Sequence, residues 1–322
     1  MFGDVCSGAP RTTSECVGPL KALCARHGWR VAISGDLPAS SPCAVPSWSD
    51  PQNSLRVSRI VDDFGVLIVN FLNLAVAEVS PPSNTIQVFP LVPGLSPHTL
   101  EHFVLDVLLP RLIAEDAPLV VHGALMSRGD DGICLVGDSG RGKSTLSAAL
   151  RAAGWDFHGD DALVLRPDGA GITAQATYPS LRLLPDSLQQ LFPEPPAGLS
   201  PVADYLDKYR FDPGNMADPT LPCRLRAVFV LGGDVGTAAA TALTASRLCM
   251  TLIGQAFALD PSDPKGAHAR LSAASAVAAA VPGFMLDYPR DYACLPEVIE
   301  KIGAILLEAG QNEAAGPADR NE

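Results

Sequence analysis

Alternating apolar and polar residues over 55–61 predict a β-strand early in the chain, because this period of two places the apolar side chains on one face of a sheet. Residues 65–69 form a short apolar run, which we expect to be its partner strand. Residues 62–65, with Asp62 and Asp63, would form the hairpin turn between them. A third strand is predicted at 84–89, after a Pro-Pro turn.

Helical periodicity appears in later segments. Residues 99–114 predict an amphipathic helix that Pro110 interrupts, and residues 295–307 predict the last helix. Two further helices are expected over 243–257 and over the alanine-rich residues 267–281, which stop before Pro282. Residues 193–222 are polar and rich in proline, so we expect them to form a long loop.

Residues 119–176 combine short apolar runs with one helical run. Strands are predicted at 119–125, 132–136, 162–165 and 172–176, and a helix at 145–153 that ends at Gly154. A turn at 128–132 would join the first two strands as a hairpin, which an open, all-parallel nucleotide-binding sheet would not normally contain. The expected fold class is therefore α/β, with a mixed sheet that contains antiparallel hairpins.

A glycine-rich sequence lies between the strand at 132–136 and the helix from 145. Residues 137–144, which we call the phosphate loop, match the pattern G-x-x-x-x-G-K-[ST] at every position. The match, with the following Thr145, reads Gly137-Asp138-Ser139-Gly140-Arg141-Gly142-Lys143-Ser144-Thr145. Backbone N–H groups and the helix dipole bind phosphate in such a loop. We expect Lys143 to reach the β- and γ-phosphates of ATP and the Ser144 hydroxyl to bind Mg²⁺.

Composition and charge narrow the classes of partner. The net charge of −12 argues against nucleic acid or an anionic membrane as the main partner. Eight scattered cysteines without a C-x-x-C pair favour a reducing compartment over a disulfide framework or structural zinc. We read no signal peptide and no apolar stretch long enough to span a bilayer, so a cytoplasmic, soluble protein is expected.

Two acidic residues follow the predicted helix, and Asp160 lies 17 residues after Lys143. We expect Asp160 and Asp161 at the start of a strand beside the strand that leads into the phosphate loop. One carboxylate can then act as general base and the other can bind Mg²⁺, whereas a solvated Asp-Asp turn is the alternative. His122 lies 15 residues before the loop, and the sequence alone is compatible with either a structural or a catalytic role for it.

These three motifs together resemble the catalytic domain of HPr kinase/phosphorylase and its relatives, over about residues 120–300. In that family a His-Gly on a strand precedes the loop and an Asp-Asp follows its helix, as in His122-Gly123 and Asp160-Asp161 here. The resemblance implies a fold like that of phosphoenolpyruvate carboxykinase. It also implies that Asp160 takes the proton from a substrate serine, that Asp161 supports the metal, and that His122 steadies Asp160.

This chain departs from the family in two places. The family commonly has Glu where this chain has Thr145, and the glycine-rich arginine signature of the bifunctional enzymes has no clear equivalent. HPr is therefore not implied as the substrate, and some divergent relatives modify peptides in biosynthetic clusters. Arg182, Lys208 and Arg210 are candidates for binding substrate or the transferred phosphate.

The sequence is expected to form four parts. These are residues 1–54 (a helix, a strand and a Pro/Ser-rich linker), residues 55–118 (a small α+β domain), residues 119–308 (the HPr kinase-like catalytic domain) and residues 309–322 (a disordered tail). The leading hypothesis is an ATP- and Mg²⁺-dependent kinase that phosphorylates a serine of a protein or peptide. The alternatives are a plain ATPase and a nucleotide-responsive regulatory module without phosphoryl transfer. A homo-oligomer is left open.

Overall fold

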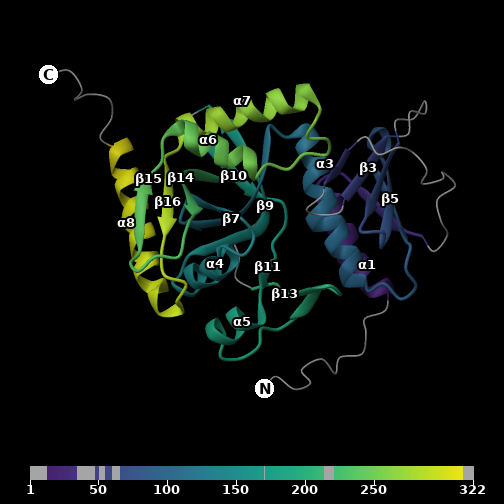
Figure 1. Cartoon of the computed structure of the whole chain (residues 1–322), viewed down its shortest axis with the longest axis horizontal. Helices are drawn as coiled ribbons and strands as arrows, with labels where there is room; N and C mark the ends of the chain where they lie inside the picture. Colours follow the sequence, from purple (N-terminus) through teal and green to yellow (C-terminus); the bar gives the residue numbers. More distant parts are fainter. Residues whose placement is uncertain are drawn as a thin grey trace. The chain divides into compact units, whose positions relative to one another are not determined.

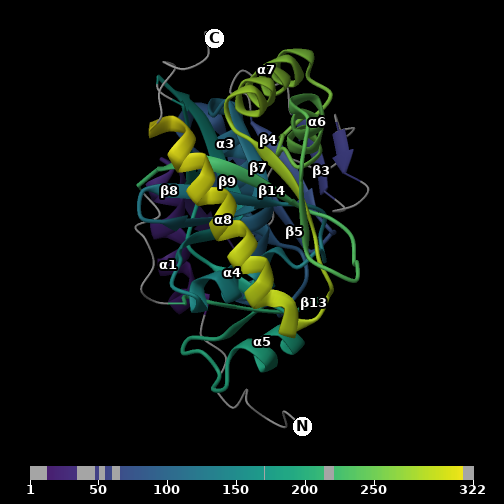
Figure 2. The ribbon, with the colours of Figure 1, turned by 90° about the vertical axis from the view of Figure 1, so that its left-hand side faces the viewer.

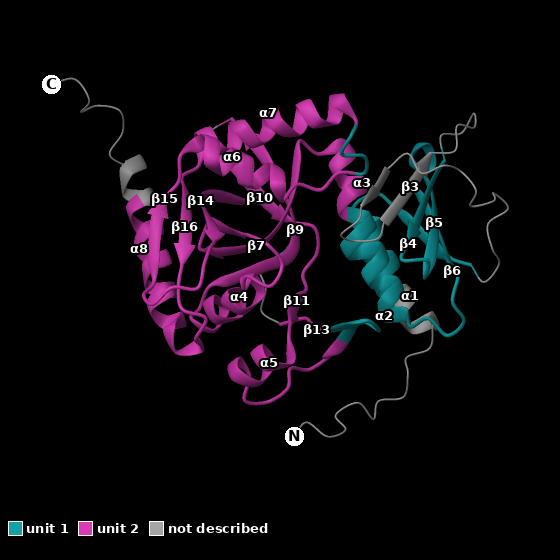
Figure 3. Cartoon of the chain, in the orientation of Figure 1, with its two compact units in different colours: residues 1–109, 201–207, 259–262 teal, residues 110–200, 208–258, 263–322 magenta. Residues whose placement is uncertain are grey.

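The computed structural model describes residues 13–34, 48–50, 55–59, 66–169, 171–213 and 221–314. The chain divides into two compact units (Figure 3). Unit 1 comprises residues 1–109, 201–207 and 259–262, and unit 2 comprises residues 110–200, 208–258 and 263–322. The hairpin turn expected at 62–65 lies outside the described residues, and so do residues 315–322 of the expected tail. The four-part division stays a prediction.

Unit 1 is built on a mixed six-stranded sheet in the order β1-β6-β5-β4-β3-β2. Its strands are β1 (Arg30–Ile33), β2 (Trp48–Asp50), β3 (Leu55–Arg59), β4 (Leu67–Phe71), β5 (Ala75–Ser80) and β6 (Thr85–Pro90), and its helical segments are α1 (Thr13–Arg26), η1 (Pro81–Ser83), α2 (Pro97–Glu101) and η2 (His102–Leu108). Strand β1 pairs parallel with β6, and the other neighbours are antiparallel. In the core, the ring of Phe71 stacks on that of Phe103 with 4.8 Å between centroids.

The predicted helix around Pro110 is one continuous run that changes its hydrogen bonding. After α2 it continues as the π-helical η2 and then as α3 (Leu109–Asp116). The N–H of Leu109 donates to the carbonyl of Val104, five residues earlier. Proline lacks an N–H and its ring clashes with the carbonyl four residues before it, so a wider turn ahead of Pro110 accommodates the ring without ending the helix.

Unit 2 contains a seven-stranded sheet in the order β10-β9-β7-β8-β14-β16-β15 (Figures 1 and 2). The strands are β7 (Leu119–Arg128), β8 (Asp131–Val136), β9 (Asp156–Asp168), β10 (Gly171–Ala176), β14 (Cys223–Leu231), β15 (Ala239–Ala242) and β16 (Gly283–Asp287). The helical segments are α4 (Lys143–Ala152), α5 (Pro185–Leu191), α6 (Ala245–Gly254), α7 (Pro264–Ala280), η3 (Tyr292–Cys294) and α8 (Leu295–Ala314). Strands β8, β14 and β16 are parallel, whereas β7 is antiparallel to both β8 and β9. The mixed α/β sheet with hairpins that the sequence predicted is therefore present.

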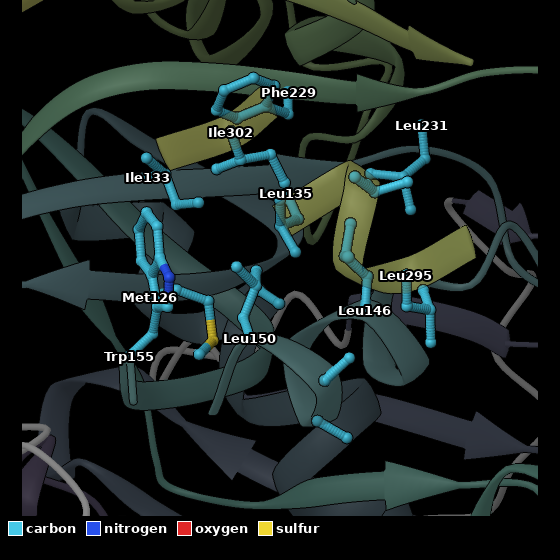
Figure 4. Close-up of a cluster of buried hydrophobic side chains, with 14 of the residues drawn as sticks. Met126, Ile133, Leu135, Leu146, Leu150, Trp155, Phe229, Leu231, Leu295 and Ile302 are labelled. Atoms are coloured by element: carbon cyan, nitrogen blue, oxygen red, sulfur yellow. The ribbon is translucent and has the colours of Figure 1, made fainter. Parts of the chain in front are cut away.

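Helices cover both faces of this sheet, because alternate side chains along each strand point to opposite faces. Helices α4 and α8 pack on one face, where Leu146, Leu150 and Ile302 meet Leu135 and Phe229 (Figure 4). Helices α6 and α7 pack on the other face through Leu248, Leu252 and Val277, among other residues. The phosphate loop thus leaves a strand that is held between two apolar layers.

Two strands that the sequence analysis placed in a long loop correct the expectation for residues 193–222. They are β12 (Ser200–Ala203) and β13 (Leu206–Phe211), and β13 pairs antiparallel with β11 (Leu181–Leu183). Strands β5 and β15 were also not predicted. The proline-rich composition of 193–222 hid β13, whose sequence Leu-Asp-Lys-Tyr-Arg-Phe has no apolar alternation that would predict a strand.

No helix among the described residues is long and apolar enough to cross a membrane.

Candidate functional site

The phosphate loop connects the carboxyl end of β8 to the first turn of α4, as the sequence predicted. Gly140 and Gly142 have φ of 81° and 87°, in the left-handed region that favours glycine. Gly142 caps α4, which begins at Lys143. The first N–H groups of a helix have no partner within the helix, so this end of α4 can bind an anion. Ser144 and Thr145 follow within the same turn.

Lys143 lies buried inside the loop, with 6% of its surface exposed. Its Nζ donates to the main-chain oxygens of Gly137 at 2.6 Å and Asp138 at 3.2 Å. Burial lowers the pKa of Lys143, and Lys208 acts in the same direction. Asp160 is the first of three carboxylates that oppose this shift in the pKa, so it lies close enough to act on the charge of Lys143. The structure therefore brings together the loop lysine and the acidic pair.

Both oxygens of Asp161 are engaged by cations or histidine. The Oδ1 atom lies 3.1 Å from His122 Nδ1, and the Oδ2 atom forms an ion pair with Arg182 Nη2 at 3.1 Å. Although burial opposes it, these two partners hold the pKa of Asp161 well below its usual range. Asp161 is therefore held in its ionised form, with one partner already in contact with each of its oxygens.

This arrangement corrects the contact that the resemblance implied for His122. We expected His122 to steady Asp160, but its Nδ1 atom instead lies 3.0 Å from the main-chain oxygen of Asp161, beside the Oδ1 contact. The register explains the difference. His122 on β7 lies opposite Ala162, next to Asp161, whereas Asp160 lies opposite Ala124.

Asp160 differs from Asp161 in its surroundings. Only 6% of its surface is exposed. The Oδ2 atoms of both aspartates lack a hydrogen-bond partner in the described part of the chain, but Asp161 Oδ2 has its ion pair with Arg182 and Asp160 Oδ2 has none. Its main-chain oxygen accepts from Arg182 Nη2 at 2.6 Å, so the backbone is fixed while the carboxylate keeps an unused acceptor. A buried acceptor without a partner is costly, and such atoms commonly mark catalytic or ligand sites.

The position of the acidic pair within its strand also differs from the prediction. Asp160 and Asp161 lie inside β9, not at its start, and β7 separates β9 from β8. We underestimated the strand because Gly159 and two aspartates are poor strand formers. Gly159 is required there, since a Cβ would lie 2.6 Å from the Cβ of Ala176 and 2.7 Å from the oxygen of Tyr178.

The three predicted substrate cations lie on β11 and β13. Arg182 pairs directly with Arg210 across the two strands, and Lys208 lies two residues from Arg210 along β13. Arg182 is committed to Asp161, as described above. Lys208 lies near enough to lower the pKa of Lys143, which places it at the phosphate loop. These strands thus bring basic residues to the same region.

Several residues that contact the phosphate loop were missed by the sequence analysis. Gln255, at the end of α6, donates through Nε2 to Asp138 Oδ1 at 3.3 Å. Arg290 donates to the carbonyl of Arg141, and Ser187 lies 2.9 Å from Thr145 Oγ1. The available signal was topological. The carboxyl ends of parallel strands meet at one edge, so Arg290, which lies shortly after β16, could be expected near a loop that follows β8, whereas Gln255 and Ser187 had no such signal.

A divalent cation fits this site only together with a phosphate ligand. No group of three or more His, Cys, Asp or Glu side chains within the described residues could hold a metal by itself. Mg²⁺ is usually held by one or two side chains together with substrate phosphates and water. The Ser144 hydroxyl in the first turn of α4 fits that kind of coordination.

Comparisons with known proteins add likenesses to solved structures. No protein-family model matches the chain, and no curated protein matches it. Among solved structures, the chain is similar to the HPr(Ser) kinase/phosphatase from Coxiella burnetii, with 11% sequence identity and a TM-score of 0.30. The match covers 61% of this chain and 99% of that one.

Proposed function

We propose that this protein is an ATP- and Mg²⁺-dependent kinase that transfers the γ-phosphate to a serine hydroxyl of a protein or peptide. The observation that carries the proposal is the buried Asp160 carboxylate, whose Oδ2 atom lacks a partner while Asp160 acts on the charge of Lys143. A module that only bound nucleotide would gain nothing from a buried, unused proton acceptor. The motif order shared with HPr kinase/phosphorylase supports serine as the acceptor.

The residues divide the reaction as follows. Phosphate oxygens would replace the carbonyls of Gly137 and Asp138 as partners of Lys143, whose positive charge then faces the transferred group. The serine oxygen forms a bond to the γ-phosphorus while the bond to the bridging oxygen of ADP breaks. The serine proton passes to Asp160 Oδ2, and the products are ADP and a phosphoserine.

The anchor residues keep this acceptor in place. Arg182 holds the Asp160 backbone and the Asp161 carboxylate with the same guanidinium group. His122 holds Asp161 from the other side. We therefore assign Asp161 to orienting the acidic pair and Ser144 to binding Mg²⁺, which when bound neutralises charge on the β- and γ-phosphates. Lys208 is left to contact the phosphate or the acceptor.

A label-transfer experiment tests the proposal. The purified protein is incubated with γ-labelled ATP, Mg²⁺ and a lysate of its host, as wild type and as Lys143→Ala, Asp160→Asn and Asp168→Asn variants. Asp168, at the exposed end of β9, is the matched control for a carboxylate in the same strand. We expect acid-stable label on a protein or peptide with wild type and Asp168→Asn, and a loss of about 10²–10⁴-fold with Asp160→Asn.

Other outcomes would contradict the kinase. Free labelled phosphate without any labelled acceptor would indicate an ATPase. ATP binding without turnover, unchanged by Asp160→Asn, would indicate a regulatory module. Asp160→Asn should retain ATP binding, because its side chain is not part of the phosphate loop, so loss of binding in that variant would also contradict the role assigned here.

A further inference from the structure

Arg290 joins the phosphate loop to the end of a neighbouring strand. Its Nη1 donates to the carbonyl of Arg141 and its Nη2 to the carbonyl of Gly232, each at 2.8 Å. Its guanidinium carbon lies 4.5 Å from the ring centroid of Tyr288. The planar guanidinium group can reach two carbonyls at once and stack on an aromatic ring, which an ammonium group cannot do.

These contacts lie at the part of the loop whose conformation is most demanding. Gly142 turns the chain into α4 with a positive φ. A Cβ at Gly142 would lie 3.3 Å from Tyr288 Oη and 3.4 Å from Arg290 Nη1. Tyr288 and Arg290 therefore pack directly against the turn that aims the first N–H groups of α4 at a phosphate.

A second contact from the same segment reaches the first turn of α4. Tyr292 donates its hydroxyl proton to Asp186 Oδ2 at 2.6 Å, and the Ser187 hydroxyl lies 3.1 Å from Tyr292 Oη. Because the single proton of Tyr292 is used, Ser187 must donate to Tyr292 and accept from Thr145 at 2.9 Å. The hydroxyls thus form a chain with one direction, which ends on a carboxylate.

We propose that residues 288–292 form a brace that holds the phosphate loop in its phosphate-binding conformation, with Arg290 and Tyr292 as positioning residues. This inference rests on the proposed function, since it assumes that the loop binds the phosphates of ATP. Arg290 holds the turn before α4 through the carbonyl of Arg141, and Tyr292 acts on Thr145 through Ser187. Neither residue takes part in the chemical step.

The test separates a role in phosphate binding from contact with the base or ribose. We would measure the affinity of wild type, Arg290→Gln and Tyr292→Phe for MgATP and for tripolyphosphate, which carries the phosphates without the nucleoside. Arg290→Gln is expected to lower the affinity for both ligands by the same factor, about tenfold. Tyr292→Phe should lower both affinities by roughly threefold. Arg166→Gln, an exposed arginine on β9, is the control and should change neither.

The results distinguish the possible failures. A loss for MgATP alone would overturn the brace and place Arg290 against the nucleoside, and unchanged affinities would show that the contacts do not position the loop. If Arg290→Gln does not fold, Arg290→Lys replaces it and should show the same tenfold loss, because the single nitrogen of lysine cannot occupy both guanidinium donor positions and has no planar face to stack on Tyr288. If wild type bound neither ligand, the proposed function itself would fail.

Discussion

His158 illustrates how a single buried group can set the response of this protein to pH. Its Nε2 atom lies 2.8 Å from Ser127 Oγ, and both residues are buried. The Nδ1 atom has no hydrogen-bond partner in the described part of the chain. Burial lowers the pKa of His158, although Asp156 opposes the shift. The folded protein therefore favours the neutral imidazole.

Stability should consequently fall as the pH falls through the histidine range. Below a pH of about 6.5 the unfolded chain binds a proton at His158 that the folded chain resists, so the free energy of unfolding decreases by up to about 1.4 kcal/mol per pH unit. His158→Gln should flatten this slope in urea unfolding between pH 5 and 7. Asp161, whose pKa is lowered, loses its contribution only at pH values below about 4 and does not confound this window. An identical slope in both proteins would contradict the role of His158.

The sequence was informative about single residues where their function depends on near neighbours in the chain. Gly140, Gly142 and Lys143 were predicted because a phosphate loop is encoded within eight consecutive residues. Arg290 was not, because it contacts Arg141 across 149 residues and Gly232 across 58. The contact between His122 and Asp161 depends on the register of β7 and β9, which a pattern of apolar residues did not fix to one residue.

At the scale of elements, the two glycines in the turn before α4 allow the effect of backbone strain to be distinguished from the effect of side-chain packing. Gly140 and Gly142 have similar positive φ, but a Cβ at Gly140 has no atom within 4 Å. A left-handed alanine costs about 1–2 kcal/mol, so Gly140→Ala should destabilise the protein by that amount. Gly142→Ala should cost more, because the methyl group must displace Tyr288 Oη or Arg290 Nη1.

The same pair of variants should differ in ligand binding. We expect Gly142→Ala to lower the affinity for MgATP more than Gly140→Ala does. Affinity and the free energy of unfolding are measured for both variants in the same buffer. Equal losses of affinity and of unfolding free energy in both variants would mean that only the backbone strain matters and that packing against residues 288–292 has no effect.

Whole elements were predicted best where their pattern was long. The sequence predicted α4, α6, α7 and α8 because each has a clear apolar face or a definite end, such as Gly154 or Pro282. Strand β15 was missed because Ala-Ala-Thr-Ala has no alternation to read. The order of the strands could not be predicted in detail, since β7 lies between β8 and β9 through long-range pairing that no local pattern specifies.

At the scale of the whole molecule, binding should protect one unit more than the other. Within the described residues, the contacts given above for the phosphate loop and the acidic pair all come from unit 2. At a MgATP concentration 100 times its dissociation constant, binding stabilises the native state by about 2.7 kcal/mol. Amide hydrogen exchange should therefore slow in α4, β7 and β9, and much less in β4, β5 and β6 of unit 1. Equal slowing in both units would show that they unfold together.

The antiparallel placement of β7 has a consequence for how the protein is made. Strand β7 pairs with β8 on one side and with β9 on the other. These three strands span one continuous stretch, 119–168, which also contains His122, the phosphate loop, Asp160 and Asp161. The pairings of β7 with β8 and with β9 both fall within this stretch, which costs less chain entropy than pairing with distant parts of the chain. Translation proceeds at about 5–20 residues per second, so this stretch is synthesised on the order of ten seconds before Arg290. The nascent chain therefore carries the groups that we propose for phosphoryl transfer before it carries the proposed brace of their phosphate loop.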